Sequence, residues 1–189
     1  MGDKHDRSMM ENLYWWGVPT LFRAPHEAAA GADIALVGVP HSTGNGTTER
    51  DQHLGPRAVR NVSALQRRAH GGFQLDPWEA AKIVDIGDVP FRSRYSLSDS
   101  LADIESFFGT VRAAGAKPLA IGGDHSVSYP ILKALGADRP VGMVHIDAHC
   151  DTSGEVEDVK FHHGGPFRHA VLDGAVSYTH LRAHETVDY

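Results

Sequence analysis

Four residues of this chain have the types and spacing of metal ligands, namely His125, Asp147, His149 and Asp151. In an extended segment, residues at i, i+2 and i+4 point the same way, so the alternating trio at 147–151 is expected to converge. Two carboxylates and an imidazole held together repel and lose hydration unless a cation lies among them. A nitrogen and oxygen set without thiolate suits Mn, Fe(II), Zn or Ni.

Each part of this pattern also has an ordinary structural explanation. A single Asp-x-His pair is usually a surface loop, and a His after a strand usually makes a structural hydrogen bond. The combination of Asp-x-His-x-Asp after one apolar segment and Gly-Gly-Asp-His after another favours the metal site. Asp124 is expected to orient His125 or to cap the following helix, and Cys150 is expected to pack away from the ligands.

The elements that must position these residues alternate between apolar strands and amphipathic helices. Strands are predicted at residues 33–39, 82–87, 118–122 and 141–146, and helices at 55–68, 98–114 and 127–135. The strands are continuous apolar runs, which is typical of sheets covered by helices on both faces. The pattern predicts an α/β fold with a mainly parallel sheet, and both motifs follow strands, at the carboxyl ends where ligands bind.

Composition excludes several classes of partner and location. The net charge is -6 and the pI is about 6.1, which argues against a nucleic acid or an anionic membrane as partner. The single cysteine excludes an internal disulfide, so we expect a reducing, cytoplasmic setting. The first residues show no apolar leader, and no apolar run is long enough to span a membrane.

Three successive motifs follow the predicted strands: GGDHS at 122–126, HIDAHCDT at 145–152 and FHHGGPFR at 161–168. Their order and spacing resemble those of the ureohydrolases, which include arginase, agmatinase and guanidinobutyrase. The resemblance covers about residues 15–174 and is stronger to the agmatinase and guanidinobutyrase branch. It implies the N-terminal portion of an arginase-like three-layer α/β/α fold, and a homotrimer or homohexamer.

The resemblance implies two manganese ions and the hydrolysis of a linear guanidino compound, agmatine or 4-guanidinobutyrate, to urea and an amine. Asp147 would bridge both ions, His125 and Asp151 would complete one site, and His149 would bind the other ion. A hydroxide shared by the ions would attack the guanidinium carbon. Asp151 would also orient this hydroxide, and His163 would carry a proton to the leaving amine.

The resemblance is incomplete towards the C-terminus. The family has a second metal-binding motif, Asp-x-Asp, and a later substrate-binding glutamate, and this sequence contains neither after the three motifs. Residues 1–174 are therefore expected to be the N-terminal part of a ureohydrolase domain. Residues 175–189 are expected to be a tail foreign to the family, and residues 176–186 of this tail resemble translated sequencing-adapter sequence. With four ligands for two ions, we expect the chain as written to bind one ion weakly and to be inactive.

Two other functions fit the same residues. Deacetylases on a related fold use one zinc ion and a similar Asp-x-His motif, although His125 and its spacing to Asp151 favour two ions. The chain would otherwise be a non-catalytic, truncated family member that acts within an oligomer. A count of bound metal distinguishes the first alternative, and a native transcript that ends at Tyr189 would support the second.

Overall fold

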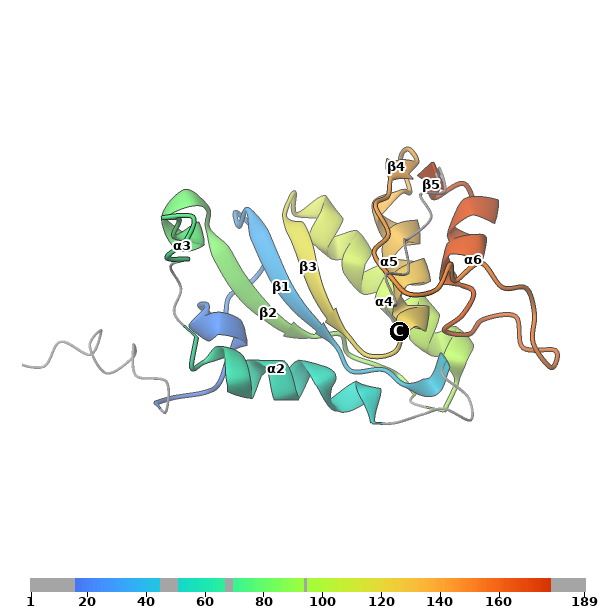
Figure 1. The fold of residues 1–189 in the computed structure, drawn as a ribbon, viewed down its shortest axis with the longest axis horizontal. Coiled ribbons are helices and arrows are strands. Elements are labelled where there is room, and N and C mark those ends of the chain that lie inside the picture. The colour runs from blue at the N-terminus through green and yellow to red at the C-terminus, as the bar shows by residue number, and fades with distance from the viewer. Residues whose placement is uncertain (1–15, 45–50, 67–69, 94, 178–189) are drawn as a thin grey trace, which may run out of the picture.

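A computed structural model describes residues 16–44, 51–66, 70–93 and 95–177. Its centre is a three-stranded parallel sheet in the order β2-β1-β3 (Figure 1). The strands are β1 (Ile34–Val39), β2 (Ile83–Asp88) and β3 (Lys117–Gly122). These strands confirm three of the four predicted from the apolar runs.

Helices cover both faces of this sheet, as the continuous apolar strands predicted. α4 (Leu97–Ala113) and α5 (Ser128–Leu135) pack on one face, where they bury Ala35, Val37 and Val39 of β1. α2 (Gly55–Ser63) and the 3-10 turn η1 (Leu21–Arg23) pack on the other face, around Leu36 (Figure 1). Alternate residues of β1 therefore enter two separate cores, and the three-layer α/β/α arrangement is confirmed.

The long helix α4 forms where its sequence predicts. The Ser96 hydroxyl caps its N-terminus by accepting a hydrogen bond from the Asp99 amide, at 3.3 Å. Leu101, Ile104, Phe108 and Val111 are buried at helical spacing, on the face towards the sheet. Gly115 follows the helix with φ +79°, a left-handed conformation that glycine adopts without strain and that commonly ends helices.

The fourth predicted strand is wrong in length and in pairing. Only β4 (Val141–Gly142) is a strand, and it pairs in parallel with β5 (Val176–Ser177) in a separate two-stranded sheet. The apolar run is extended chain, but a strand also needs a hydrogen-bonded neighbour. Among the described residues, β3 has β1 as its only ladder partner, so residues 143–146 remain unpaired.

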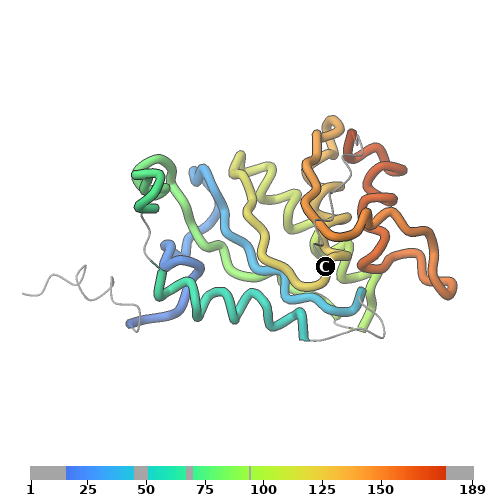
Figure 2. Tube along the Cα trace, in the orientation of Figure 1, coloured from blue at the N-terminus to red at the C-terminus, as the bar shows by residue number. Residues whose placement is uncertain are grey.

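Residues 141–177 form the remaining part of the described chain, beside α5. Figure 2 shows this segment, orange to red, at the side of the molecule away from β2. α6 (Pro166–Leu172) and β5 pack there against Leu101 and Tyr129. The helix predicted at 55–68 is too long, since it ends at Ser63 and residues 64–66 form a turn. Residues 178–189 of the predicted tail lie outside the described residues, so the boundary at residue 174 stays a prediction. Within the described residues, no helix is long and apolar enough to cross a bilayer.

A buried ion pair joins α2 to β2 and η1. The Arg60 guanidinium donates two hydrogen bonds to Asp85, both at 3.1 Å, and a third at 2.5 Å to Asp88. Asp85 also accepts hydrogen bonds from the backbone amides of Leu21 (2.7 Å) and Gly87 (2.9 Å). Asp85 is 1% exposed and Arg60 7% exposed, so this pair lies in the layer between α2 and the sheet.

Candidate metal centre

The loops that follow β1 and β3 lie side by side, because the two strands are in register from Ile34↔Lys117 to Val39↔Gly122. Gly123 makes the close approach possible. It has φ +47°, and a Cβ at this position would lie 2.5 Å from the Val39 carbonyl oxygen and 2.7 Å from that of His41. Glycine is therefore required here for both conformation and space.

Replacement of Gly123 by alanine tests this requirement. We expect Gly123→Ala to lower the free energy of unfolding by about 1–3 kcal/mol, because alanine is strained at positive φ and its Cβ meets backbone. Denaturant unfolding of both chains measures the change. Gly154→Ala is the matched control, since nothing lies within 4 Å of the added Cβ. Equal losses in the two variants would contradict the assignment.

Asp124 begins the 3-10 turn η4 (His125–Val127) and thereby places His125. Its carboxylate accepts hydrogen bonds from the amides of Ser126 (2.8 Å) and Gly44 (2.9 Å), which confirms the predicted cap. Burial alone would raise the pKa of Asp124, but the side chains of His41 and Ser126 outweigh it, and the pKa is lowered. Asp124 therefore joins the two loops as a buried carboxylate, and His125 projects from the turn that it caps.

Four ligand atoms converge beside this turn, one each from His125, His145, Asp147 and Asp151, and all lie within 4.8 Å of one another. His125 Nδ1 lies 2.5 Å from Asp151 Oδ2 and 3.5 Å from Asp147 Oδ2. His145 Nε2 lies 3.5 Å from the same Asp147 oxygen. The structure thus brings together three of the four predicted ligands, and adds a histidine that was not predicted.

His149 lies outside this cluster. Its side chain is 81% exposed, and its Nδ1 lies 3.6 Å from Asp147 Oδ1, on the outer side of that carboxylate. The expectation of one extended segment at 147–151 is wrong: residues 147–149 form a bend, the His149 amide donates to Asp147 Oδ1 at 3.0 Å, and Asp151 has φ +48°. The turn rotates His149 away, because the period of two holds only in extended chain. Its role as a ligand stays a prediction.

His163, the predicted proton carrier, is an exposed turn residue. Its backbone amide donates to the Gly44 carbonyl at 2.9 Å, and the Gly44 amide donates to Asp124, so its loop is attached to the loops that hold His125. His162 uses both ring nitrogens in backbone hydrogen bonds, to the Gly154 carbonyl at 2.7 Å and from the Gly164 amide at 3.2 Å. His162 is therefore a structural residue of the loop, whereas the role of His163 stays a prediction.

The cluster rests on an aromatic ring of α6. The Phe167 ring centroid lies 4.2 Å from that of His145 and 5.2 Å from that of His125. The Phe167 amide also donates to the Asp151 carbonyl at 3.2 Å. Sequence reasoning missed His145 and Phe167, although His145 stands two residues before Asp147, at the spacing of a shared face. Cys150 is exposed, so the expectation that it packs is wrong.

The electrostatics of the cluster suit a cation. The amide of His149, and then the imidazoles of His145 and His125, lower the pKa of Asp147 against the opposing effect of burial. Asp147 is therefore ionised at neutral pH. His145 Nε2 is buried without a hydrogen-bond partner among the described residues. Two carboxylates and two imidazoles, one of which has the unpartnered nitrogen, fit a divalent ion of the manganese to zinc series.

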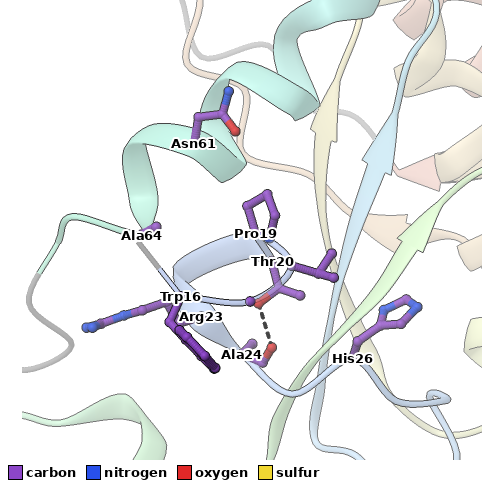
Figure 3. Close-up of a pocket in the computed structure, with 10 residues that line it drawn as sticks. Trp16, Pro19, Thr20, Arg23, Ala24, His26, Asn61 and Ala64 are labelled. Atoms are coloured by element: carbon purple, nitrogen blue, oxygen red, sulfur yellow. Dashed lines mark hydrogen bonds between the residues drawn. The ribbon is translucent and has the colours of Figure 1, made fainter. Parts of the chain in front are cut away.

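A separate cavity of about 570 Å³ lies beside η1 and α2 (Figure 3), and none of the residues that line it belongs to this cluster. Figure 3 shows its lining, in which the Thr20 hydroxyl donates to the Ala24 carbonyl at 2.8 Å. His26 Nδ1 is 2.9 Å from the Asp85 carbonyl, and Arg23 donates to the Gln66 carbonyl at 3.3 Å. These groups have backbone partners and form no ligand cluster, so the chemistry is placed at His125 and its neighbours.

Comparison with known proteins identifies the family of this chain. A model described as the arginase family matches residues 32–184. The chain belongs to the arginase family. This membership confirms the resemblance drawn from the three motifs, and it agrees with the parallel sheet and with the ligand cluster at the carboxyl ends of its strands.

Individual members of the arginase family show how much of the fold is present. A guanidinopropionase from Pseudomonas aeruginosa is 43% identical over 160 residues, which cover 84% of this chain and 50% of that protein. A mitochondrial agmatinase from Gallus gallus is 39% identical over 84% of this chain and 46% of its own length. A formiminoglutamase from Trypanosoma cruzi, solved with Mn²⁺, superposes with a TM-score of 0.71 at 27% identity, over 85% of this chain and 55% of its own. The chain spans about half the length of these relatives.

Proposed function

We propose that this chain carries one half of the metal centre of an amidinohydrolase that cleaves a linear guanidino compound to urea and an amine. The observation that carries the proposal is the convergence of His125, Asp147 and Asp151 on one point at the carboxyl ends of a parallel sheet. A polar cluster at this place in an α/β fold is where catalysis is expected. Membership of the arginase family supports the reaction class.

The proposed substrates are agmatine and 4-guanidinobutyrate. The names of the relatives support a short alkyl chain with a guanidino group at one end: one is an agmatinase and another a guanidinopropionase. The substrates in these names differ at the end opposite to the guanidino group. Agmatine carries an ammonium group there, and the guanidino acids carry a carboxylate. 3-Guanidinopropionate therefore belongs in any substrate panel.

The reaction requires a strong, well-placed nucleophile, because a guanidinium ion is a poor electrophile. His125, Asp147 and Asp151 would hold manganese, with His149 as the further ligand that the resemblance implies. Manganese held there would supply a water of lowered pKa, so that hydroxide is available as the nucleophile at neutral pH. Asp151 would accept a hydrogen bond from the attacking oxygen and direct it at the guanidinium carbon.

Departure of the amine requires a proton, since an amide ion is too basic to leave. His163 would donate this proton to the leaving nitrogen as the bond between carbon and nitrogen breaks, a role suited to imidazole near neutral pH. The water oxygen stays on carbon, so the products are urea and the protonated amine. The attachment of the His163 loop to Gly44 supports this assignment by keeping the loop beside the turn of His125.

Urea release tests the proposal. The assay uses manganese with agmatine, 4-guanidinobutyrate, 3-guanidinopropionate and arginine. It compares the 189-residue chain with the product of the same gene after resequencing past the codon for Gly174. We expect urea from at least one linear guanidino compound with the resequenced product, and none from the 189-residue chain. Absence of urea from every substrate with both proteins would rule the proposal out.

Metal counting in the same samples tests the deacetylase alternative. One tightly bound zinc per chain, with release of acetate from acetylated amines, would support a deacetylase instead. A native transcript that ends at Tyr189 would support a non-catalytic member. Sedimentation of the resequenced product tests the proposed homotrimer or homohexamer, and the cytoplasmic location stays a prediction.

A further inference from the structure

We propose that His41, in the loop after β1, is a positioning residue of the metal centre. Its imidazole faces the carboxylate of Asp124 and thereby fixes the turn from which His125 projects. The proposal rests on the proposed function only in that the cluster holds a divalent ion. The observation behind it is that His41 Nδ1 lies 3.5 Å from Asp124 Oδ2, with both side chains almost fully buried.

The His41 imidazole is buried where a purely apolar side chain would be less costly. Its side chain is 3% exposed, and neither ring nitrogen makes a hydrogen bond within the described residues. Buried polar groups without partners are destabilising, so they are rare and call for an explanation. The Phe91 ring lies at a centroid distance of 5.6 Å, but packing on phenylalanine requires no nitrogen. The Asp124 carboxylate is the neighbour that gives the imidazole a purpose.

The two oxygens of the Asp124 carboxylate have different neighbours. Oδ1 accepts a hydrogen bond from the Ser126 amide at 2.8 Å, within the turn itself. Oδ2 accepts one from the Gly44 amide at 2.9 Å and faces His41, so this oxygen is held by the loop after β1. Burial alone would raise the pKa of Asp124, but the side chain of His41, and then that of Ser126, outweigh it. His41 therefore helps to keep this buried carboxylate charged.

The backbone carries this constraint from Asp124 to His125. Asp124 is the N-terminal cap of η4, and His125 is the first residue of that turn. The Asp124 amide also donates to the His41 carbonyl at 2.9 Å, so both the main chain and the side chain of His41 contact Asp124. Two contacts at different atoms fix the orientation of the turn as well as its position. A cluster whose supporting groups are fixed in this way binds an ion more tightly than a loose one.

Three substitutions of His41 separate the effect of the Nδ1 nitrogen from that of the ring. His41→Phe keeps a ring against Phe91 without nitrogen, His41→Asn places an amide nitrogen near the position of Nδ1, and His41→Gln places one near that of Nε2. Calorimetry with Mn²⁺ on the 189-residue chain measures the affinities. We expect His41→Phe and His41→Gln to weaken binding by at least about tenfold, the lower end of the effect of losing an outer-shell partner. We expect His41→Asn to stay within about threefold of the parent chain, well short of that loss.

His70→Phe is the matched control for the loss of an imidazole. His70 is exposed and also packs on a phenylalanine, Phe73, at a centroid distance of 4.4 Å. The His70→Phe variant should bind Mn²⁺ with the affinity of the parent chain, because His70 belongs neither to the cluster nor to the contacts of Asp124.

A second measurement needs no metal. The amides of Gly44 and Ser126 both donate to the Asp124 carboxylate, so their hydrogen exchange reports how firmly that carboxylate is held. We expect both amides to exchange at least about tenfold faster in His41→Phe than in the parent chain, through local opening of the turn. The Gly136 amide, which donates to a carbonyl of α5, should be unchanged.

Parent-like Mn²⁺ affinity in His41→Phe, or parent-like exchange at Gly44 and Ser126, would overturn the proposal. A loss in His41→Asn as large as that in His41→Phe would also overturn it, since a nitrogen near the Nδ1 position would then have no effect. So would a parent chain that binds no Mn²⁺. If His41→Phe does not fold, the comparison of His41→Asn with His41→Gln gives the same answer. None of these readouts depends on urea release, so failure here is distinct from failure of the proposed function.

Discussion

Arg60→Met is expected to lower the free energy of unfolding by about 3–5 kcal/mol, because it leaves the Asp85 carboxylate buried without its counter-charge. Asp85 is 1% exposed, and Arg60 donates to both of its oxygens. Two backbone amides would still donate to the carboxylate, but they carry no full charge. Methionine fills much of the same volume, so the loss reports the ion pair rather than a cavity. Denaturant unfolding of the 189-residue chain measures it.

Arg57→Met is the control for this variant, because Arg57 lies on the same helix and is exposed. Its effect should stay within about 0.5 kcal/mol. If both variants lose the same stability, the loss comes from the helix and not from the ion pair. A second variant that also replaces Asp85 by leucine should recover part of the loss, because the buried charge is then gone.

The same ion pair makes the free energy of unfolding depend on pH. Burial alone would raise the pKa of Asp85, but the hydrogen bonds from Arg60, Leu21 and Gly87 outweigh it and lower the pKa below its ordinary value of 3.8. A lowered folded-state pKa gives stability that is fully present above the unfolded pKa and is lost as the pH falls through the folded value. The parent chain should therefore lose this contribution only below about pH 4. Arg60→Met should depend less on pH in that range.

Asp147→Asn is expected to weaken Mn²⁺ binding by more than about 100-fold, beyond the effect of losing an outer-shell partner. Asp147 faces two imidazoles through one oxygen, at 3.5 Å from each, and it is ionised because its pKa is lowered. Asparagine keeps the shape and can still accept the hydrogen bond from the His149 amide, so the bend is preserved. The loss therefore reports the charge. Calorimetry on the 189-residue chain measures it, and urea release from the resequenced gene product should fall with it.

Asp158→Asn provides the matched control. Asp158 is an exposed carboxylate of the following loop, and its positive φ of 63° suits asparagine. The Mn²⁺ affinity of the Asp158→Asn variant should equal that of the parent chain. If Asp147→Asn binds Mn²⁺ as well as Asp158→Asn does, then the cluster is not the metal site, and the proposed function loses the observation that carries it.

The strands and most of the ligands could be predicted from local sequence. β1, β2 and β3 are runs of apolar residues, and such runs are buried in a sheet covered on both faces whatever their neighbours are. Asp124, Gly123 and His125 follow β3 directly, so their place at its carboxyl end follows from chain order. Asp151 joined them because its motif follows the next apolar segment, even though that segment does not form the expected strand.

The choice between His145 and His149 could not be predicted in this way. Both stand two residues from Asp147, and the period of two treats them alike. The decision lies in the bend at 147–149, which a hydrogen bond to the Asp147 side chain stabilises, and in the Phe167 ring supplied by α6 from twenty residues further along the chain. Contacts between distant segments leave no periodic trace in sequence.

The sequence by itself determined the fold class, the family and a candidate metal cluster that includes His125, Asp147 and Asp151, since these depend on residue type and on order along the chain. Only the tertiary structure decided that β4 pairs with β5, that Arg60 meets Asp85, and that His145 completes the cluster. Each of these is a contact between segments whose relative position depends on the packing of the whole domain. Local sequence sets which groups are available, and packing sets which of them come within reach of one another.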